Sequence, residues 1–354
     1  MYTSESAGSP PLRTDTHAGV GDDALVAEWD ALAARDPHAT VFQHARWLAR
    51  WESVLAGQRE LRTRTFRRDG ELVGVLCETR ELLRLPSGPV ELIRLAGGDE
   101  VTDYLGPVAA PEDREAVADA YVAALAADRG WDELVLGGLA ADTDWPALFA
   151  DAAARHGLTV VHDDVEAVCP QVDLTGGFGA YLTRLPGRMR NELTRKARKL
   201  VRDAGPFEIH TYAPSDTLQG IEDFLTEVQS GDDEKAAFFR RPEMQQWFRT
   251  LAGEYAADAT LRVHRLDIGE LNAAMTVSLV DAPDRDGRTW GLYNSSFDPT
   301  LAALAPGMVL IWELIERAAD EGCITFDLLR GDEPYKYRFG AVDREVRTLT
   351  LARR

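Results

Sequence analysis

The sequence predicts a mixed α/β protein built from two similar halves, and three observations lead to this prediction. The 354 residues are 45% hydrophobic, which is enough to bury the cores of two ordinary domains. Short strand-like runs alternate with amphipathic helical runs, as in sheets covered by helices. The order of these runs recurs after about 190 to 200 residues, which an internal duplication explains. Chance similarity of two generic α/β halves is the alternative.

The chain is predicted to begin with a flexible leader followed by two helices. Residues 1–20 contain Ser, Gly, Thr and two adjacent prolines without a hydrophobic period, so we leave them outside the fold. Between Asp22 and Leu55 the apolar residues recur at helical spacing, with a break near Asp36-Pro37. This pattern predicts two helices.

The rest of the first half reads as a hairpin followed by alternating strands and helices. The hairpin turns at Arg68-Asp69-Gly70. Strands are expected at 61–66, 71–79, 92–95, 101–105, 131–136, 159–162 and 165–173, and helices at 112–127 and 144–156. We therefore take residues 21–175 as the N-terminal half.

The second half, residues 176–354, repeats this order. Strands are expected at 261–266, 271–280, 289–295 and 324–329, with a helix from Gly307 to Asp320 that Gly322 caps. Three landmarks match between the halves: Gly70-Glu71-Leu72 with Gly269-Glu270-Leu271, Tyr104 with Tyr293, and 131–136 with 324–329.

Composition excludes several classes of function. The three cysteines are scattered and outside any C-x-x-C spacing, and the seven histidines show no ligand spacing, so we expect no disulfide framework and no metal site. Serine-hydrolase and P-loop motifs are absent. The net charge of −20 disfavours DNA and anionic membranes as partners. No apolar run is long enough for a membrane span and no signal-peptide pattern occurs, so we expect a cytoplasmic protein without membrane insertion.

The segment Ala305-Pro306-Gly307-Met308 is the first candidate site. It opens the second half's helix directly after a strand and its loop. Unpaired amide groups and the positive end of the helix dipole attract anions there, and Gly307 lets a pyrophosphate approach closely. Plain helix initiation by Pro and Gly is an equally good reading of these residues.

The run from Phe326 to Gly340 is the second candidate site. It leaves a buried strand at its carboxyl end, where residues of an open α/β sheet face a ligand crevice. A solvated turn held by ion pairs is the alternative. The candidate substrate-binding residues are Tyr293, Asn294, Asp327, Arg330 and Lys336, and the candidate catalytic residues are Tyr335, Glu333 and Asp332.

The segment Asp327-Leu328-Leu329-Arg330-Gly331-Asp332-Glu333-Pro334-Tyr335-Lys336 resembles the C-terminal signature of cellulose-biosynthesis-type acetyltransferases (the CelD/BcsL type) of the GNAT superfamily. Ala305-Pro306-Gly307 resembles the helix-opening turn that precedes that signature. Phe42–Leu48 and Arg188–Leu193 agree with the same family. Together these short stretches span most of the chain from Val41 to Gly340.

The resemblance implies a tandem GNAT-like fold related to the FemABX peptidyltransferases, with a degenerate N-terminal half and the acyl-donor groove in the C-terminal half. Ala305 to Met308 would form the pyrophosphate turn for acetyl-CoA or another acyl-CoA, although many relatives carry a basic residue and more glycines there. Tyr335 resembles the tyrosine that protonates the leaving thiolate. The general base stays open among Glu333, Asp332 and Asp327.

Residues 184–202 are a third candidate, because they hold eight Lys or Arg residues against the single acid Glu192. An apolar stripe at helical spacing lets this segment pack on the body and still display its charges. It is either a phosphate- or RNA-binding helix or a linker helix whose cations answer the acidic surface.

The function expected from all of this is acyl transfer to an amine or sugar hydroxyl of a small-molecule or saccharide acceptor. An aminoacyl-tRNA-dependent transferase ranks below it, because most of the surface is acidic. A non-catalytic GNAT-like binding module is the third hypothesis.

Overall fold

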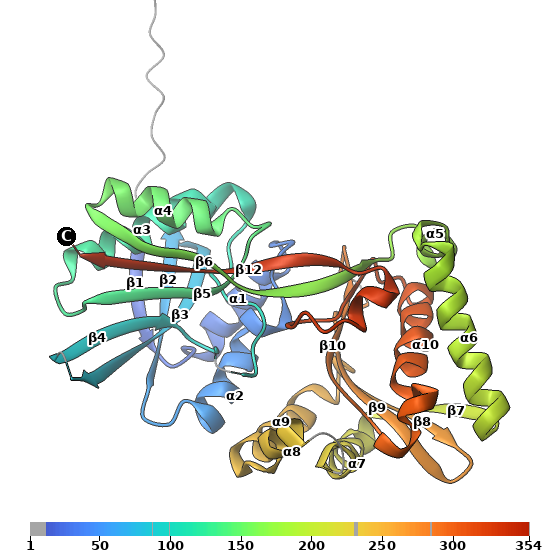
Figure 1. Ribbon diagram of the computed structural model, residues 1–354. Helices are drawn as coiled ribbons and strands as arrows, with labels where there is room; N and C mark the ends of the chain where they lie inside the picture. Colours follow the sequence, from blue (N-terminus) through green and yellow to red (C-terminus); the bar gives the residue numbers. More distant parts are fainter. Residues whose placement is uncertain (1–11, 87, 99, 230–232, 284, 354) are drawn as a thin grey trace, which may run out of the picture. The chain divides into compact units, whose positions relative to one another are not determined.

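The computed structural model describes residues 12–353 except 87, 99, 230–232 and 284. It divides into two compact units (Figure 1). The N-terminal unit comprises the chain up to residue 52 with 56–166 and 346–354, and the C-terminal unit comprises 53–55 and 167–345. Two long strands, β6 (Leu158–Asp173) and β12 (Val342–Arg353), have residues in both units.

The N-terminal unit is a mixed sheet covered by helices. Its strands run in the order β1-β2-β3-β4-β5-β12, and β4 and β5 are its parallel pair. The strands are β1 (Arg13–Ala18), β2 (Glu60–Arg68), β3 (Glu71–Leu85), β4 (Gly88–Leu95) and β5 (Glu133–Ala140). The helices are α1 (Asp23–Ala33), α2 (Ala45–Leu55), α3 (Arg114–Ala127) and α4 (Trp145–Arg155).

The C-terminal unit repeats this arrangement, with strand order β7-β8-β9-β10-β11-β6 and the parallel pair β10 and β11. Its strands are β7 (Phe207–Thr211), β8 (Leu261–Ile268), β9 (Leu271–Val280), β10 (Thr289–Phe297) and β11 (Thr325–Asp327). Its helices are α5 (Gly177–Arg184), α6 (Gly187–Ala204), α7 (Thr217–Gln229), α8 (Asp233–Arg240), α9 (Pro242–Tyr255) and α10 (Pro306–Asp320).

The strand pairing confirms the predicted two-half fold in detail. Phe66 pairs with Gly74 and Leu266 with Ala274, and a bulge follows at the same place in both hairpins. The structural offset in these hairpins is therefore 200 residues, one more than the sequence match at the turn gives. Tyr104 lies outside β4 and Tyr293 lies within β10, so that landmark pair is not equivalent.

Two of the predicted boundaries differ from the structure. Residues 13–18, inside the predicted leader, form β1 and pair with β2, whereas residues 1–11 lie outside the described part of the chain. The last residues return to the N-terminal unit, where Leu349 and Leu351 of β12 pair with β5. Strand pairing between distant segments therefore moves both ends away from the boundaries that local composition suggests.

Helix α10 shows how local sequence and packing combine in the C-terminal unit. Pro306 occupies its first turn, where the missing N–H has no cost. Its buried residues are Val309, Leu310, Ile311, Trp312, Leu314, Ile315 and Ala318. They join one core with residues of β9, β10 and α6. Gly322, with a φ of +84°, follows the helix end.

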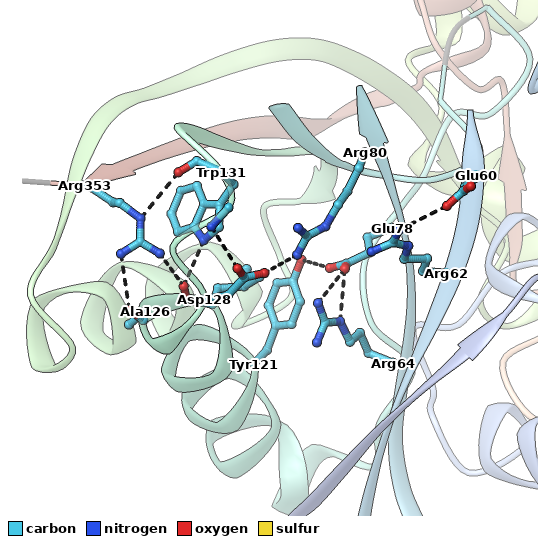
Figure 2. Close-up of polar contacts among 12 residues, drawn as sticks. Glu60, Arg62, Arg64, Glu78, Arg80, Tyr121, Ala126, Asp128, Trp131 and Arg353 are labelled. Carbon is cyan, nitrogen blue, oxygen red and sulfur yellow. Dashed lines mark hydrogen bonds and ion pairs between the residues drawn. The ribbon is translucent and has the colours of Figure 1, made fainter. Parts of the chain in front are cut away.

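A buried polar network lies beside α3 in the N-terminal unit (Figure 2). The Glu78 carboxylate is fully buried and accepts two hydrogen bonds from Arg64, at 3.0 and 2.7 Å, and one from the Tyr121 hydroxyl at 2.8 Å. Arg80 pairs with Asp128 close by. Because each charge has an opposite partner, this network is compatible with burial.

Candidate functional site

The two parallel strands of the C-terminal unit separate after three residue pairs. Thr289 to Gly291 pair with Thr325 to Asp327, and β10 then continues to Phe297 without another described pair to β11. The chain after β11 stays with β6 instead, because Leu328 N donates to Pro170 O and Gly331 N to Val168 O, both at 2.9 Å. The separation gives β10 a free backbone edge.

A bulge at Tyr293 changes the direction of β10 at this point, because the register with β9 shifts between Leu292 and Asn294. The Tyr293 hydroxyl accepts a hydrogen bond from Trp247 Nε1 of α9 at 3.0 Å. Asn294 Oδ1 accepts the amide of Ser295 at 3.0 Å. The two predicted substrate residues therefore lie at the bulge, with Tyr293 anchored toward α9.

Tyr335 lies beside β10 and is partly buried against the core that α10 covers. Its hydroxyl makes a side-chain hydrogen bond with Ser295. Burial raises the pKa of Tyr335 to about 12, the charge of Glu333 adds to this, and the bond with Ser295 acts in the opposite direction. The phenol is thus protonated at neutral pH, as a proton donor must be.

The loop that carries Tyr335 is held by a buried lysine. The Lys336 ammonium donates to the carbonyl oxygens of Leu329, Arg330 and Gly331 at 3.0, 2.8 and 3.1 Å, and Glu333 lies 2.9 Å away. These contacts use the three donors of the ammonium, so they favour a positioning role for Lys336 over the predicted substrate contact.

Asp327 ends β11 and shapes the start of the same loop. Its buried carboxylate accepts the Leu329 amide and the Gln171 side-chain amide, each at 2.7 Å. Leu329 has a φ of +54°, which is uncommon for a bulky residue and marks a backbone that its surroundings hold in place. Gly331 is needed because a Cβ there would lie 2.5 Å from the Glu333 carboxylate.

The remaining predicted residues of the loop differ in exposure. Arg330 is partly exposed, while Asp332 and Glu333 are exposed. Glu333 combines a half-exposed side chain with its ion pair to Lys336. Of the two acidic candidates, Glu333 is therefore the more restrained and Asp332 the more accessible to water.

The predicted pyrophosphate turn opens α10 as expected from the sequence. Ala305 has a left-handed backbone with φ of 53°, and Met308 N and Val309 N both return to its carbonyl oxygen. The first turn of α10 contains no acidic residue. A Cβ at Gly307 would meet Phe297 of β10 at 3.6 Å. The helix start thus lies beside the end of β10.

Sequence analysis missed three polar residues near β10. Besides Ser295, these are Lys235 of α8, whose ammonium donates to Ser295 O, and Glu227 of α7. Burial first, and the charge of Asp298 second, raise the pKa of Glu227. These residues come from separate elements, and no local motif joins them to Tyr335, so only the folded chain reveals them.

The basic segment 184–202 spans the end of α5 and most of α6, broken at Pro186. Leu185, Leu193 and Leu200 are buried in the α10 core, which confirms the apolar stripe. Some of the cations have partners within the chain: Arg184 pairs with Asp173, Arg202 with Asp203, and Lys199 Nζ donates to Ala303 O at 3.0 Å.

Two further findings concern the described residues as a whole. None of the helices there is long and apolar enough to cross a membrane. No group of three or more His, Cys, Asp and Glu side chains in the described ranges is arranged to hold a metal ion.

Comparisons with known proteins identify a domain family for the C-terminal unit. Residues 187–337 match the family described as the acetyltransferase (GNAT) domain. No curated protein matches the chain. Among solved structures, FemX is similar with a TM-score of 0.65 and 12% identity, covering 92% of this chain and 95% of that one. A conserved protein of unknown function from Bacteroides thetaiotaomicron has a TM-score of 0.56 and 11% identity, with 93% and 97% covered. At these identities the two structures support the fold alone.

Proposed function

We propose that the GNAT domain of this chain transfers an acetyl or longer acyl group from acyl-CoA to an amine, or a sugar hydroxyl, of a small-molecule or saccharide acceptor. One observation carries the proposal. The separation of β10 from β11 leaves a free strand edge that leads to the acid-free start of α10, with Tyr335 beside it.

The residues fit such a donor chemically. The pyrophosphate would lie at Ala305 to Met308, where the helix dipole favours negative charge. The amide-containing arm of the donor would follow the edge of β10 between Leu292 and Phe297, in the way that extended peptides add to free strand edges. Bound in this way, the donor supplies an activated thioester carbonyl.

The chain's own residues handle the protons. The acceptor nitrogen forms the new bond to the acyl carbon while the carbon–sulfur bond breaks, and the Tyr335 hydroxyl gives its proton to the departing sulfur. A carboxylate takes the proton of the acceptor amine. Glu227 joins Glu333 and Asp332 as a candidate for that base, because its raised pKa makes its carboxylate a stronger proton acceptor.

Calorimetry with acetyl-CoA and longer acyl-CoAs tests the donor. We expect binding with a dissociation constant in the micromolar range, and a melting temperature that rises with donor concentration. Release of free thiol with a panel of amines and amino sugars then identifies the acceptor. Absence of binding and of thiol release for every acyl-CoA would remove the proposal.

The cationic face of α6 favours a second candidate, in which aminoacyl-tRNA supplies the acyl group. Arg188, Arg195 and Arg198 are exposed there. The net charge of −20 weakens this candidate. Binding of bulk tRNA that falls steeply with salt, together with no response to acyl-CoA, would favour it over the first.

A further inference from the structure

Helix α6 displays cations that the rest of this acidic protein does not neutralise. Arg188, Arg195, Lys196 and Arg198 make no hydrogen bond or ion pair within the described residues. The protein has 59 acidic residues against 39 Lys and Arg, so acidic partners are plentiful elsewhere. Unpaired cations gathered on one helix therefore suit an external anion.

One contact relates these cations to the start of α10. The Lys199 ammonium donates to the carbonyl oxygen of Ala303 at 3.0 Å, two residues before the turn at Ala305. Lys199 also lies 3.4 Å from Asp203. Arg195 and Lys196 precede Lys199 by four and three residues, so they lie one helical turn from it on neighbouring positions of the surface.

The start of α10 itself offers no cation to a phosphate. Its first residues are Pro306, Gly307 and Met308, which provide backbone amides and the helix dipole only. Coenzyme A carries a pyrophosphate and, on the ribose of its adenosine, a separate 3′-phosphate with up to two negative charges. If the pyrophosphate lies at these amides, the 3′-phosphate lies nearby and requires its own counter-charge.

We propose that Arg195, Lys196 and Lys199 of α6 form the subsite for the 3′-phosphate of the donor's adenosine. This inference rests on the proposed function, because it assumes that coenzyme A enters along β10. Charge-assisted bonds from ammonium and guanidinium groups to a phosphate are among the stronger polar contacts in proteins. The subsite supplies from another helix the positive charge that the pyrophosphate turn lacks.

The test compares acetyl-CoA with acetyl-3′-dephospho-CoA by calorimetry. The wild-type protein should bind acetyl-CoA about tenfold or more tightly, since the second donor lacks the recognised phosphate. The variant Lys196→Gln/Lys199→Gln should bind both donors within about threefold of each other, and should keep the wild-type affinity for the dephospho form. Thermal melting checks that the variant is folded.

Arg198→Gln is the matched control. Arg198 is exposed and unpaired like the proposed residues, but it points about 100° around the helix from Lys199. This variant should keep the wild-type preference for acetyl-CoA. Its use separates a specific subsite from a general effect of positive charge.

The outcomes separate this inference from the proposed function. If the wild type binds both donors equally, or the double variant keeps the preference, the subsite is wrong while acyl-CoA binding stands. If the double variant loses tRNA binding but not the preference, α6 serves RNA instead and the subsite is overturned. If no acyl-CoA binds to the wild type, both proposals fall together.

Discussion

The two units share one strand order but treat the separation of their parallel strands differently. In the N-terminal unit, Leu105 returns to β5, where its amide donates to Gly138 O at 2.7 Å and it forms a parallel bridge with Leu139. In the C-terminal unit no such bridge joins β10 to β11 beyond Gly291 in the described residues. The first unit therefore fills with its own chain the place that the second leaves open.

The helix starts next to these separations differ in the same direction. Ala110-Pro111 precedes α3 as Ala305-Pro306 opens α10, but acidic Glu112 and Asp113 follow in the N-terminal unit. Carboxylates at a helix start occupy the site that favours anions. The comparison supports the idea that a duplicated fold kept a donor groove in one copy, and used the same positions for its own stability in the other.

The largest expected effect is on catalysis in the C-terminal unit. Tyr335→Phe should lower kcat by ~10²–10⁴-fold with little change in donor affinity, because only the proton donor is removed. Tyr337→Phe is the control, since the Tyr337 hydroxyl bonds to Asp343 on the surface. Steady-state kinetics decide the assignment, and a Tyr335→Phe kcat within about threefold of wild type would sink it.

The next effect concerns stability and contrasts two equivalent strand positions. Arg62 pairs with Glu78 as Arg262 pairs with Ser278. Glu78→Ala should cost about 3–5 kcal/mol, because it leaves the Arg64 charge buried without its partner. Ser278→Ala should cost less than about 0.5 kcal/mol, because the buried Ser278 hydroxyl has no described hydrogen-bond partner.

Urea unfolding of both variants measures this contrast. Equal losses at the two positions would mean that the C-terminal unit stabilises Ser278 through contacts as strong as those of the network in Figure 2. The comparison of buried polar groups between the units would then fail.

A pH effect should distinguish the C-terminal unit. His264 stands in β8 where Arg64 stands in β2. Burial first, then the charges of Arg317 and Arg262, lower the pKa of His264 from 6.5 to about 3. Because the folded state holds the neutral ring, this stability is present above about pH 6.5 and is lost as the pH falls toward 3, by about 2 kcal/mol at pH 5.

His264→Phe should remove that part of the acid sensitivity. Urea unfolding at pH 7 and pH 5 should show a smaller loss in the variant than in the wild type. Identical losses would contradict the assignment and attribute the acid effect to carboxylates elsewhere.

The sequence predicted the elements whose signals are local. The helix from Gly307 to Asp320 follows from Pro, apolar spacing and Gly322, and the hairpins follow from Gly70 and Gly269. It could not predict that Gly331 would bond to β6 while β10 continued alone, because both depend on pairing across more than 150 residues. The same reason hid Ser295 and Glu227, which become neighbours of the site only after folding.

The smallest expected effect tests the helix start directly by copying one unit into the other. Gly307→Glu reproduces the Pro111-Glu112 sequence of the N-terminal unit at the start of α10. The site has room for the backbone change, because a Cβ would contact Phe297 at an ordinary 3.6 Å. A carboxylate there repels a bound pyrophosphate, and at a water-accessible site this repulsion should weaken acetyl-CoA binding about tenfold. The melting temperature should hold or rise slightly, since a negative charge suits a helix start. Gly307→Gln has nearly the same shape without the charge and should weaken binding only about twofold. Calorimetry of the two variants separates charge from bulk: equal weakening by Glu and Gln would mean that size alone matters, and the pyrophosphate would then have to lie elsewhere.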